Sequence, residues 1–322
     1  MDKALTIIIP SYNVSRYIDQ LMNSLIEKQE IVDCLDIIII NDESKDDTLE
    51  KALHYSDQYP HSVRVIDKKN GGHGSGINVG VKAAKGKYLK LLDGDDWVNT
   101  VGLKELVDYI VEAKDTVDII INPFEKVWKN GVRKTVDYEK IPPRKMVSYK
   151  EINMNKYTLP LHSITIRTEL YKSKDIPEID EKISYDDMEY ILFPVPYIQR
   201  IVFLEKTLYQ YRLGLQNQSM NPSQMLKKLP MHTQVIDKLC DYYQKNRGIF
   251  NHEQEEYYIQ ELVDTIATNY VLRIKSGMNN KESKDFIKKY IEFPLDKSKN
   301  RKFTLARKNS VIGNFVIRHK RT

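Results

Sequence analysis

The chain has 322 residues, and its hydrophobic content of 41% is ample for a folded core and compatible with two domains. Its formal net charge is only +5, and its two cysteines, Cys34 and Cys240, lie in unrelated contexts that favour neither a disulfide framework nor a zinc site. No stretch reaches the roughly 18 consecutive apolar residues that span a bilayer, and the first strand begins without a preceding signal peptide. We therefore expect a cytoplasmic protein.

The first hundred residues alternate predicted strands and helices. Apolar runs predict strands over 5–10, 35–40, 63–66 and 88–92, and helices are predicted after the first two. The second helix, from about 49 to 59, follows short polar residues of the kind that cap helices. This alternation predicts an α/β fold with a mostly parallel, doubly wound sheet whose loops meet at one edge.

A glycine-rich segment over 70–80 follows the third strand, and helix is predicted to resume over 81–84. Its glycines let the backbone approach another backbone or a ligand closely. The segment lacks a Gly-Lys-Ser/Thr ending, so it is not the phosphate loop of the nucleotide hydrolases. It also lacks the Gly-x-Gly-x-x-Gly spacing of dinucleotide-binding loops.

The fourth strand runs directly into three carboxylates, Asp93, Asp95 and Asp96, with no basic residue among them. In an extended segment Asp93 and Asp95 would point the same way, because side chains alternate along a strand. Such a cluster suits a hard divalent cation, Mn²⁺ or Mg²⁺, that is held by one or two carboxylates and completed by phosphate oxygens. The alternative is a solvated acidic turn that caps the following helix.

The middle of the chain is expected to complete the same domain. A helix is predicted over 103–113 and a strand over 117–124, and Asn130-Gly131 predicts a hairpin turn. From residue 222 onward apolar residues recur at helical spacing. We therefore expect an α/β domain over 1–220 and an α-helical C-terminal region with a basic tail over 221–322.

Several motifs resemble those of glycosyltransferase family 2. Four of them match in order and spacing, and these are 10–13, 41–48, 70–80 and 93–97. A weaker second set lies around the acidic pair Asp186-Asp187 and in 209–212 with Ser219, so that the resemblance extends from residue 5 to 219. It implies a GT-A-like fold and an inverting, non-processive transferase.

The implied reaction moves one sugar from a nucleotide-sugar, with a UDP-sugar favoured, to a hydroxyl of a glycan or lipid-linked acceptor in bacterial surface polysaccharide synthesis. A cation would take up charge on the departing diphosphate, and a base would remove the acceptor proton. The resemblance implies that Asp95 ligates the metal and that Asp93 reaches the ribose, or the metal through water. It implies Asp187 as the base, although its neighbour Asp186 could exchange roles with it, and helix capping is the alternative for both.

The resemblance also implies a nucleotide site. Pro10 and Tyr12 would flank the base, Asp42 would accept from a ring N–H, and Asn70 would lie nearby. A core position for Tyr12 and a helix cap for Asp42 are the alternatives. The chain departs from the family at Ile77, where an arginine that touches the nucleotide is common.

Three further residues have two interpretations each. Arg212 can clamp the diphosphate or form a surface ion pair. Trp97 can stack on a sugar ring or pack at the start of a helix. His162 can face the diphosphate or acceptor, or be a half-buried structural histidine.

The basic charge is concentrated at the end of the chain. Residues 297–322 contain nine Lys or Arg and no acid, which leaves 41 basic against 45 acidic residues, a net of −4, elsewhere. Apolar residues within 311–317 interleave with this charge, so the segment can dock on an anionic membrane surface. A solvated tail is the alternative, and no nucleic-acid partner is expected because no stacking aromatics accompany the run.

Two other functions fit the sequence less well. A sugar-phosphate nucleotidyltransferase would carry a Gly-rich loop with Arg and Lys after the first strand, where this chain has Ser11-Tyr12-Asn13. A non-catalytic nucleotide-sugar-binding or scaffold subunit would not need Asp95 and Asp187. The transferase is therefore the preferred hypothesis.

Overall fold

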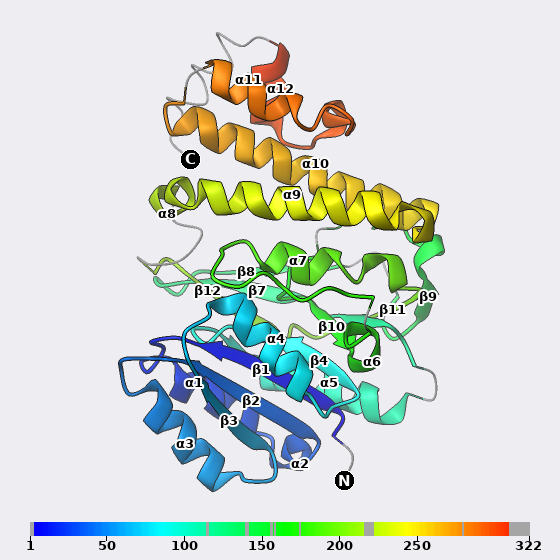
Figure 1. Ribbon diagram of the computed structural model, residues 1–322. Helices are drawn as coiled ribbons and strands as arrows, with labels where there is room; N and C mark the ends of the chain where they lie inside the picture. The colour runs from blue at the N-terminus through cyan, green and yellow to red at the C-terminus, as the bar shows by residue number, and fades with distance from the viewer. Residues whose placement is uncertain are drawn as a thin grey trace. The chain divides into compact units, whose positions relative to one another are not determined.

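The computed structural model describes residues 3–113, 116–138, 142–154, 157, 159–173, 175–215, 222–278 and 280–308. The chain divides into two compact units, Met1–Ile152 with Tyr157–Leu215 and Asn153–Lys156 with Gln216–Thr322 (Figure 1).

An eight-stranded sheet forms the centre of the first unit, in the order β3-β2-β1-β4-β10-β6-β11-β9 (Figure 1). The four strands predicted near the N-terminus are parallel neighbours, and they are β1 (Leu5–Ser11), β2 (Leu35–Asp42), β3 (Val63–Lys68) and β4 (Tyr88–Leu91). The other half is mixed and consists of β6 (Ile119–Ile121), β9 (Met146–Ser148), β10 (Ile164–Arg167) and β11 (Arg200–Phe203). The mostly parallel α/β sheet predicted from the sequence is confirmed.

The helices of this half follow the predicted rhythm. They are α1 (Ile18–Ile26), α2 (Gln29–Val32), α3 (Thr48–Gln58), α4 (His73–Ala83) and α5 (Thr100–Glu112). β1 and β2 are buried along their whole length, which explains the run of isoleucines at the centre of each strand. Their register pairs Ser11 with Asn41 and Asn41 with Asp67, so the polar ends of three strands meet at one edge.

The glycine-rich segment is helical, and the prediction that helix begins only at 81 is wrong. Three glycines lie inside α4, where an added Cβ would overlap a neighbour. At Gly74 it would lie well inside van der Waals contact with the carbonyl oxygen of Asp180, and at Gly80 it would overlap the side chain of Ile8. At Gly76 it would lie 3.0 Å from Pro10. This close packing outweighs the poor helix propensity of glycine, about 1 kcal/mol per residue relative to alanine.

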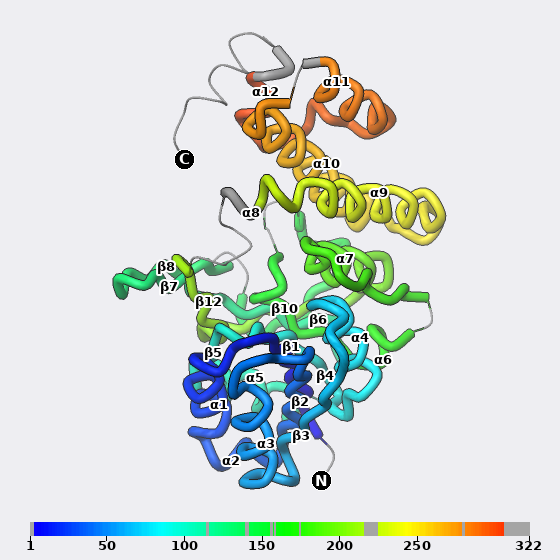
Figure 2. The backbone as a smooth tube through the Cα atoms, turned by 60° about the vertical axis from the view of Figure 1, so that its left-hand side comes forward, coloured from blue at the N-terminus to red at the C-terminus, as the bar shows by residue number. Residues whose placement is uncertain are grey.

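A second sheet lies in the same unit, in the order β5-β12-β7-β8. Its strands are β5 (Trp97–Val98), β7 (Phe124–Trp128), β8 (Arg133–Val136) and β12 (Tyr209–Leu213). The Asn130-Gly131 hairpin is confirmed, with Gly131 at φ 84° between antiparallel β7 and β8, and Figure 2 shows this hairpin projecting from the unit. The single strand predicted over 117–124 is wrong, because Pro123 lacks the N–H that a continuing strand needs and separates β6 from β7.

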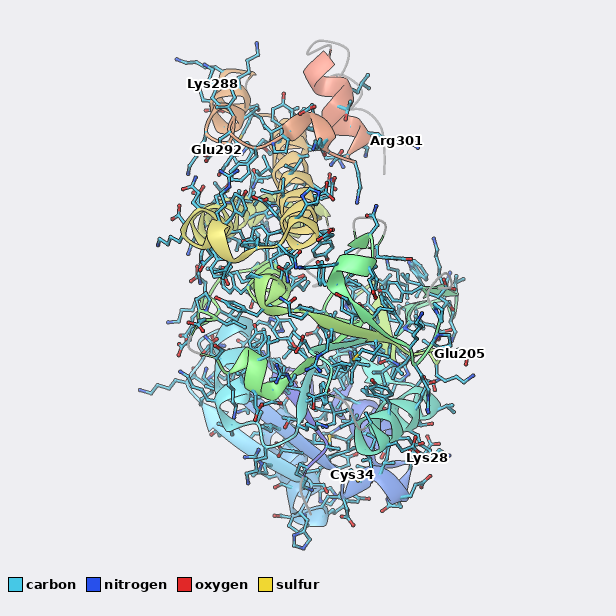
Figure 3. The ribbon with its side chains drawn as sticks, turned by 90° about the vertical axis from the view of Figure 1, so that its right-hand side faces the viewer. Lys28, Cys34, Glu205, Lys288, Glu292 and Arg301 are labelled. Atoms are coloured by element: carbon cyan, nitrogen blue, oxygen red, sulfur yellow. The ribbon has the colours of Figure 1, made fainter. Side chains whose placement is uncertain are left out.

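Short helices connect the later strands. They are η1 (Tyr149–Glu151), α6 (Thr168–Tyr171), α7 (Asp187–Leu192) and η3 (Val195–Tyr197). Cys34 lies just before β2 in this unit (Figure 3), and Cys240 lies on α9 in the other; both thiols are free.

The second unit is helical, as predicted. Its elements are α8 (Pro222–Lys227), α9 (Leu229–Asn246), η4 (Arg247–Ile249), α10 (His252–Lys275), α11 (Asn280–Lys288), η5 (Leu295–Lys297) and α12 (Arg301–Lys308). The Tyr243 and Tyr258 rings stack at 5.8 Å between α9 and α10, and Phe303 of α12 packs edge-on to Tyr270. Among the described residues no helix is long and apolar enough to cross a bilayer. The tail residues 311–317 lie outside the described part of the chain.

Candidate active site

The three carboxylates after β4 lie in a tight turn. The backbone N–H of Asp96 donates to the carbonyl of Asp93 at 3.0 Å, so residues 93–96 are not extended and the expected alternation of Asp93 and Asp95 does not apply. Asp93 and Asp95 are half-buried, whereas Asp96 is buried. The helix-capping alternative is also wrong, because Asn99 caps α5 through the N–H groups of its first turn.

Strand β12 holds this turn in place. The Tyr209 hydroxyl donates to Asp96 Oδ2 and the Arg212 N–H donates to Asp96 Oδ1, both at 2.7 Å. Burial, together with the neighbouring carboxylates of Asp95 and Asp93, raises the pKa of Asp96 well above its ordinary range. Asp96 therefore favours its neutral form more than an ordinary aspartate does.

His162 completes a group that could hold a metal ion. One ligand atom each from Asp93, Asp96 and His162 lie within 4.8 Å of one another. Burial lowers the pKa of His162 to about 4, so its imidazole is neutral at pH 7 and able to ligate. The His162 Nδ1 atom is buried and accepts or donates no hydrogen bond among the described residues. Asp95, the ligand implied by the resemblance, lies in the same turn but outside this group.

Lys90 is a further residue of the site that the sequence motifs did not indicate. This lysine is fully buried on β4, where its Nζ donates to the carbonyls of His162 at 2.9 Å and Ile164 at 3.2 Å, and burial lowers its pKa to about 7. Lys90 thereby anchors the segment that carries His162. The available signal was a lone charged residue within an otherwise apolar strand.

His73, at the start of α4, was also missed. Its Nδ1 lies 3.0 Å from Asp186 Oδ2 and its Nε2 lies 3.2 Å from Asp93 Oδ1. Burial opposes a charge on the ring, but the two carboxylates outweigh it and raise the pKa of His73 well above its ordinary value. As an imidazolium the ring donates from both nitrogens. The only signal in the sequence was a histidine flanked by glycines.

The two members of the acidic pair differ in their surroundings. Asp186 precedes α7, is buried, and makes no capping hydrogen bond with its side chain, so the capping alternative is wrong for it. Its carboxylate faces His73 instead. Asp187 begins α7 and is half-buried, and burial followed by repulsion from Asp186 raises its pKa to about 6.

The candidate nucleotide residues lie at the ends of β1, β2 and β3. Asp42 is buried and accepts from the N–H groups of Gly71 at 2.9 Å and Gly72 at 2.8 Å, and from Lys68 Nζ at 2.6 Å. It does not cap α3, since Asp47 occupies that position. The Asn70 amide donates to the Asp42 carbonyl at 2.9 Å, so these two residues are adjacent.

The other three candidates at this edge differ in exposure. The Tyr12 side chain is 52% exposed, which rules out the core alternative. Pro10 is buried in β1. Ile77, which stands where the family often has arginine, is fully buried in α4 and therefore contributes to the core.

Arg212 and Trp97 form one cluster. The Arg212 guanidinium lies over the rings of Trp97, at 4.6 Å, and Tyr17, at 4.8 Å. It also donates to the Asp95 carbonyl at 2.6 Å and to Gln20 Oε1 at 2.7 Å. The guanidinium is thus held by two aromatic rings and two hydrogen bonds, and Trp97 lies in β5 rather than at a helix start. Ser219 lies outside the described residues.

The chain is similar in sequence to several bacterial proteins, two of which follow. The chain is 27% identical over 216 residues to the poly(ribitol-phosphate) β-N-acetylglucosaminyltransferase TarS of Staphylococcus aureus. This match covers 67% of this chain and only 36% of TarS. It is 28% identical over 257 residues to the uncharacterized glycosyltransferase EpsJ of Bacillus subtilis, covering 77% of this chain and 70% of EpsJ.

Solved structures share the fold. The crystal structure of S. aureus TarS in complex with UDP-GlcNAc matches with a TM-score of 0.57 and 20% identity, over 97% of this chain and 78% of that one. The mannosyltransferase PcManGT of Pyrobaculum calidifontis, in complex with GDP-Man and Mn²⁺, matches with a TM-score of 0.53 and 12% identity, over 99% of this chain and 87% of that one. The family profile described as "Glycosyl transferase family 2" matches residues 6–175, and the chain therefore belongs to this family.

Proposed function

We propose that the protein transfers a single sugar from a nucleoside-diphosphate sugar, with a UDP-sugar favoured, to a hydroxyl of a glycan or lipid-linked acceptor, with inversion at the transferred carbon. The observation that carries this proposal is the convergence of an acidic turn, a neutral histidine and a carboxylate with a pKa of about 6 at one edge of the sheet. The acidic turn and the histidine can hold a cation that neutralises the leaving diphosphate. The carboxylate can take the proton of the attacking hydroxyl.

Asp93, Asp96 and His162 fit a divalent cation, Mn²⁺ or Mg²⁺, with Asp95 in the same turn. The crowding that raises the pKa of Asp96 would be relieved by a bound cation, which would displace its proton. The unpartnered Nδ1 of His162 also favours an ion at or near this group. When bound, such a metal neutralises the charge that develops on the departing diphosphate.

Asp187 is proposed as the base that takes the proton of the acceptor hydroxyl. Its pKa of about 6 lies closer to neutral pH than that of an ordinary aspartate, which suits general base catalysis. Asp186 is less suitable because its carboxylate is hydrogen-bonded to His73. This difference supports the assignment of the base to the second member of the pair.

The nucleotide is proposed to bind over Tyr12, Pro10, Asp42 and Asn70. The exposed Tyr12 ring offers a stacking surface for the base. Asp42 Oδ2 accepts one hydrogen bond from Gly72 and, like any carboxylate oxygen, has a second lone pair for a ring N–H such as that of uracil. Arg212 is proposed to support the diphosphate end through its bond to Asp95.

The acceptor class is proposed from the relatives. TarS is named for transfer to poly(ribitol-phosphate), which supports a bacterial surface polymer as the product. We propose that the protein acts in the cytoplasm, on the inner face of the cell membrane. A non-catalytic subunit is the remaining alternative, since family membership does not favour the nucleotidyltransferase.

Donor binding and donor hydrolysis separate these functions. UDP-GlcNAc with Mn²⁺ should raise the melting temperature of the purified chain more than either compound alone, because a ligand of the native state stabilises it. Slow release of GlcNAc into water should accompany binding in the transferase. Binding without hydrolysis under any metal condition would favour the scaffold, and neither result with any nucleotide sugar would overturn the proposal.

A further inference from the structure

Helix α4 serves as a platform for the segment that leads to the acidic pair. The Asn78 side chain donates to the Ile179 carbonyl at 2.8 Å and accepts from the Ile179 N–H at 2.9 Å, as a neighbouring strand would. The Lys182 N–H donates to the Gly71 carbonyl at 2.8 Å. Because Gly74 has no side chain, the Asp180 carbonyl can approach the helix. These contacts fix the path of the chain into α7.

His73 stands where this platform meets the acidic turn. Its ring is the first side chain of α4, and it contacts Asp93 from the end of β4 and Asp186 from the start of α7. Asp93 and Asp186 are 93 residues apart in the sequence, and within the described part of the chain the His73 side chain hydrogen-bonds to both of them.

We propose that His73 is a positioning residue that sets the separation between the metal-binding turn and the acidic pair, and that directs Asp187 rather than Asp186 toward the acceptor. This inference rests on the proposed function. His73 itself touches neither donor nor acceptor in this scheme. It holds Asp186 on one side of the start of α7. Because consecutive helical residues point about 100 degrees apart, the Asp187 carboxylate is turned away from His73.

A planar imidazole suits this role better than a flexible chain. Its two nitrogens lie at opposite edges of a rigid ring, so both carboxylates are held by a side chain with only two rotatable bonds. A lysine in its place would reach one carboxylate at a time and would lose more conformational freedom on being fixed. The His73 bridge, meaning its contacts with Asp93 and Asp186, therefore fixes the distance between these two carboxylates and also balances their negative charge.

The two contacts can be removed separately. An asparagine amide reaches about as far as the imidazole Nδ1, and a glutamine amide about as far as Nε2. His73→Asn should keep the contact to Asp186 and lose the one to Asp93, whereas His73→Gln should do the opposite. His61→Asn is the matched control, because His61 is exposed and lies outside the site.

We expect each His73 variant to lower kcat for UDP-GlcNAc hydrolysis by about 10-fold to 100-fold, the range typical of residues that orient metal ligands, while KM for UDP-GlcNAc changes less than about threefold. His61→Asn should match wild type. His73→Gln should also be non-additive with Asp186→Asn in kcat, because both changes break the same contact. A wild-type kcat in both His73→Asn and His73→Gln, or full additivity with Asp186→Asn, would overturn the proposal.

A second test measures the stability of the same variants, His73→Gln, Asp186→Asn and the double variant, by urea unfolding. This measurement does not depend on enzymatic activity. Coupling between His73→Gln and Asp186→Asn should make the unfolding equilibrium constant of the double variant differ several-fold from the value expected when the factors of the two single variants are multiplied. Absence of coupling overturns the bridge whatever the activity. Wild-type protein that binds and hydrolyses no nucleotide sugar overturns the proposed function instead, and the coupling still decides whether His73 holds Asp186.

Discussion

Asp187 and Asp186 are adjacent in the sequence, yet among the described residues His73 reaches across the site to Asp186 alone of the two. The Asp187 carboxylate has the pKa of about 6. A base must be deprotonated to act, so the activity of the free enzyme, kcat/KM, should fall as pH drops below about 6 and level off above it. A pH profile of donor hydrolysis or transfer from pH 5 to 8 measures this. A flat profile across that range would exclude Asp187 as the base.

Replacing this carboxylate should separate activity from stability. Asp187→Asn should keep UDP binding and lower transfer by 10²-fold to 10⁴-fold. Because the folded pKa is raised, ionisation of Asp187 opposes folding: its contribution to stability is present below the unfolded pKa and is lost as pH rises through about 6. At pH 7.5 the variant should therefore be more stable, on the order of 1 kcal/mol after allowance for partial exposure. Urea unfolding at pH 7.5 and at pH 4 provides the comparison.

His162 allows the metal site to be tested without disturbing packing. Its ring stacks on Phe124 at 5.2 Å and lies 4.1 Å from Tyr211, so His162→Phe should preserve these ring contacts while removing both nitrogens. We expect the apparent Mn²⁺ affinity in the presence of UDP to fall about 10-fold to 100-fold with little change in melting temperature. Unchanged Mn²⁺ affinity would place the ion elsewhere, with Asp95→Ala as the next variant to measure.

Helix α4 shows at the scale of one element why sequence-based prediction failed locally. Glycine has poor helix propensity, so 70–80 resembled a loop, but close packing on β1 and on the 179–180 backbone decides the outcome. Gly74→Ala should therefore destabilise the fold by about 1–3 kcal/mol, as overpacking does. Gly248→Ala is the control, because an added Cβ there meets nothing within 4 Å and the change should stay within about 0.5 kcal/mol. Equal stability of the two variants in urea unfolding would contradict this account.

The strands near the N-terminus were predictable because their signal is local. Continuous apolar runs ending in polar residues identified β1, β2, β3 and β4, and the rule that parallel strands present their carboxyl ends at one edge located the site. His73 and Lys90 were not predictable in this way. Their significance depends on partners at positions 186 and 162, and nothing in a single sequence pairs such distant residues.

At the scale of the whole chain, the uneven charge leads to a prediction about membranes. Removal of residues 309–322 takes away three of the nine basic residues and all of the apolar run 311–317. Cutting after Asp296, by contrast, would also remove Phe303, which is fully buried in the second unit, where Arg301 begins α12 (Figure 3). The cut after Lys308 is therefore the cleaner variant.

We expect full-length protein to bind anionic vesicles at low salt and to be released as salt rises, because the attraction is screened over about a Debye length. Protein that ends at Lys308 should bind these vesicles more weakly and hydrolyse the donor at the wild-type rate. Cosedimentation with vesicles of phosphatidylglycerol and phosphatidylcholine measures both forms. Full-length protein that ignores such vesicles at low salt would show that the tail has another role.

The contacts that build the active site join residues far apart along the chain. His73 and Asp186 are separated by 113 residues, Asn78 and Ile179 by 101, and Arg212 and Asp96 by 116. Each requires the closure of a long loop, whose entropy must be lost before the contact forms, and folding slows as such contacts dominate. The parallel strands of β1 to β4 can assemble from nearer segments. Donor hydrolysis, which needs the contacts around the acidic turn and the acidic pair, should therefore return during refolding no earlier than the secondary structure of β1 to β4, and circular dichroism followed alongside activity measures the two.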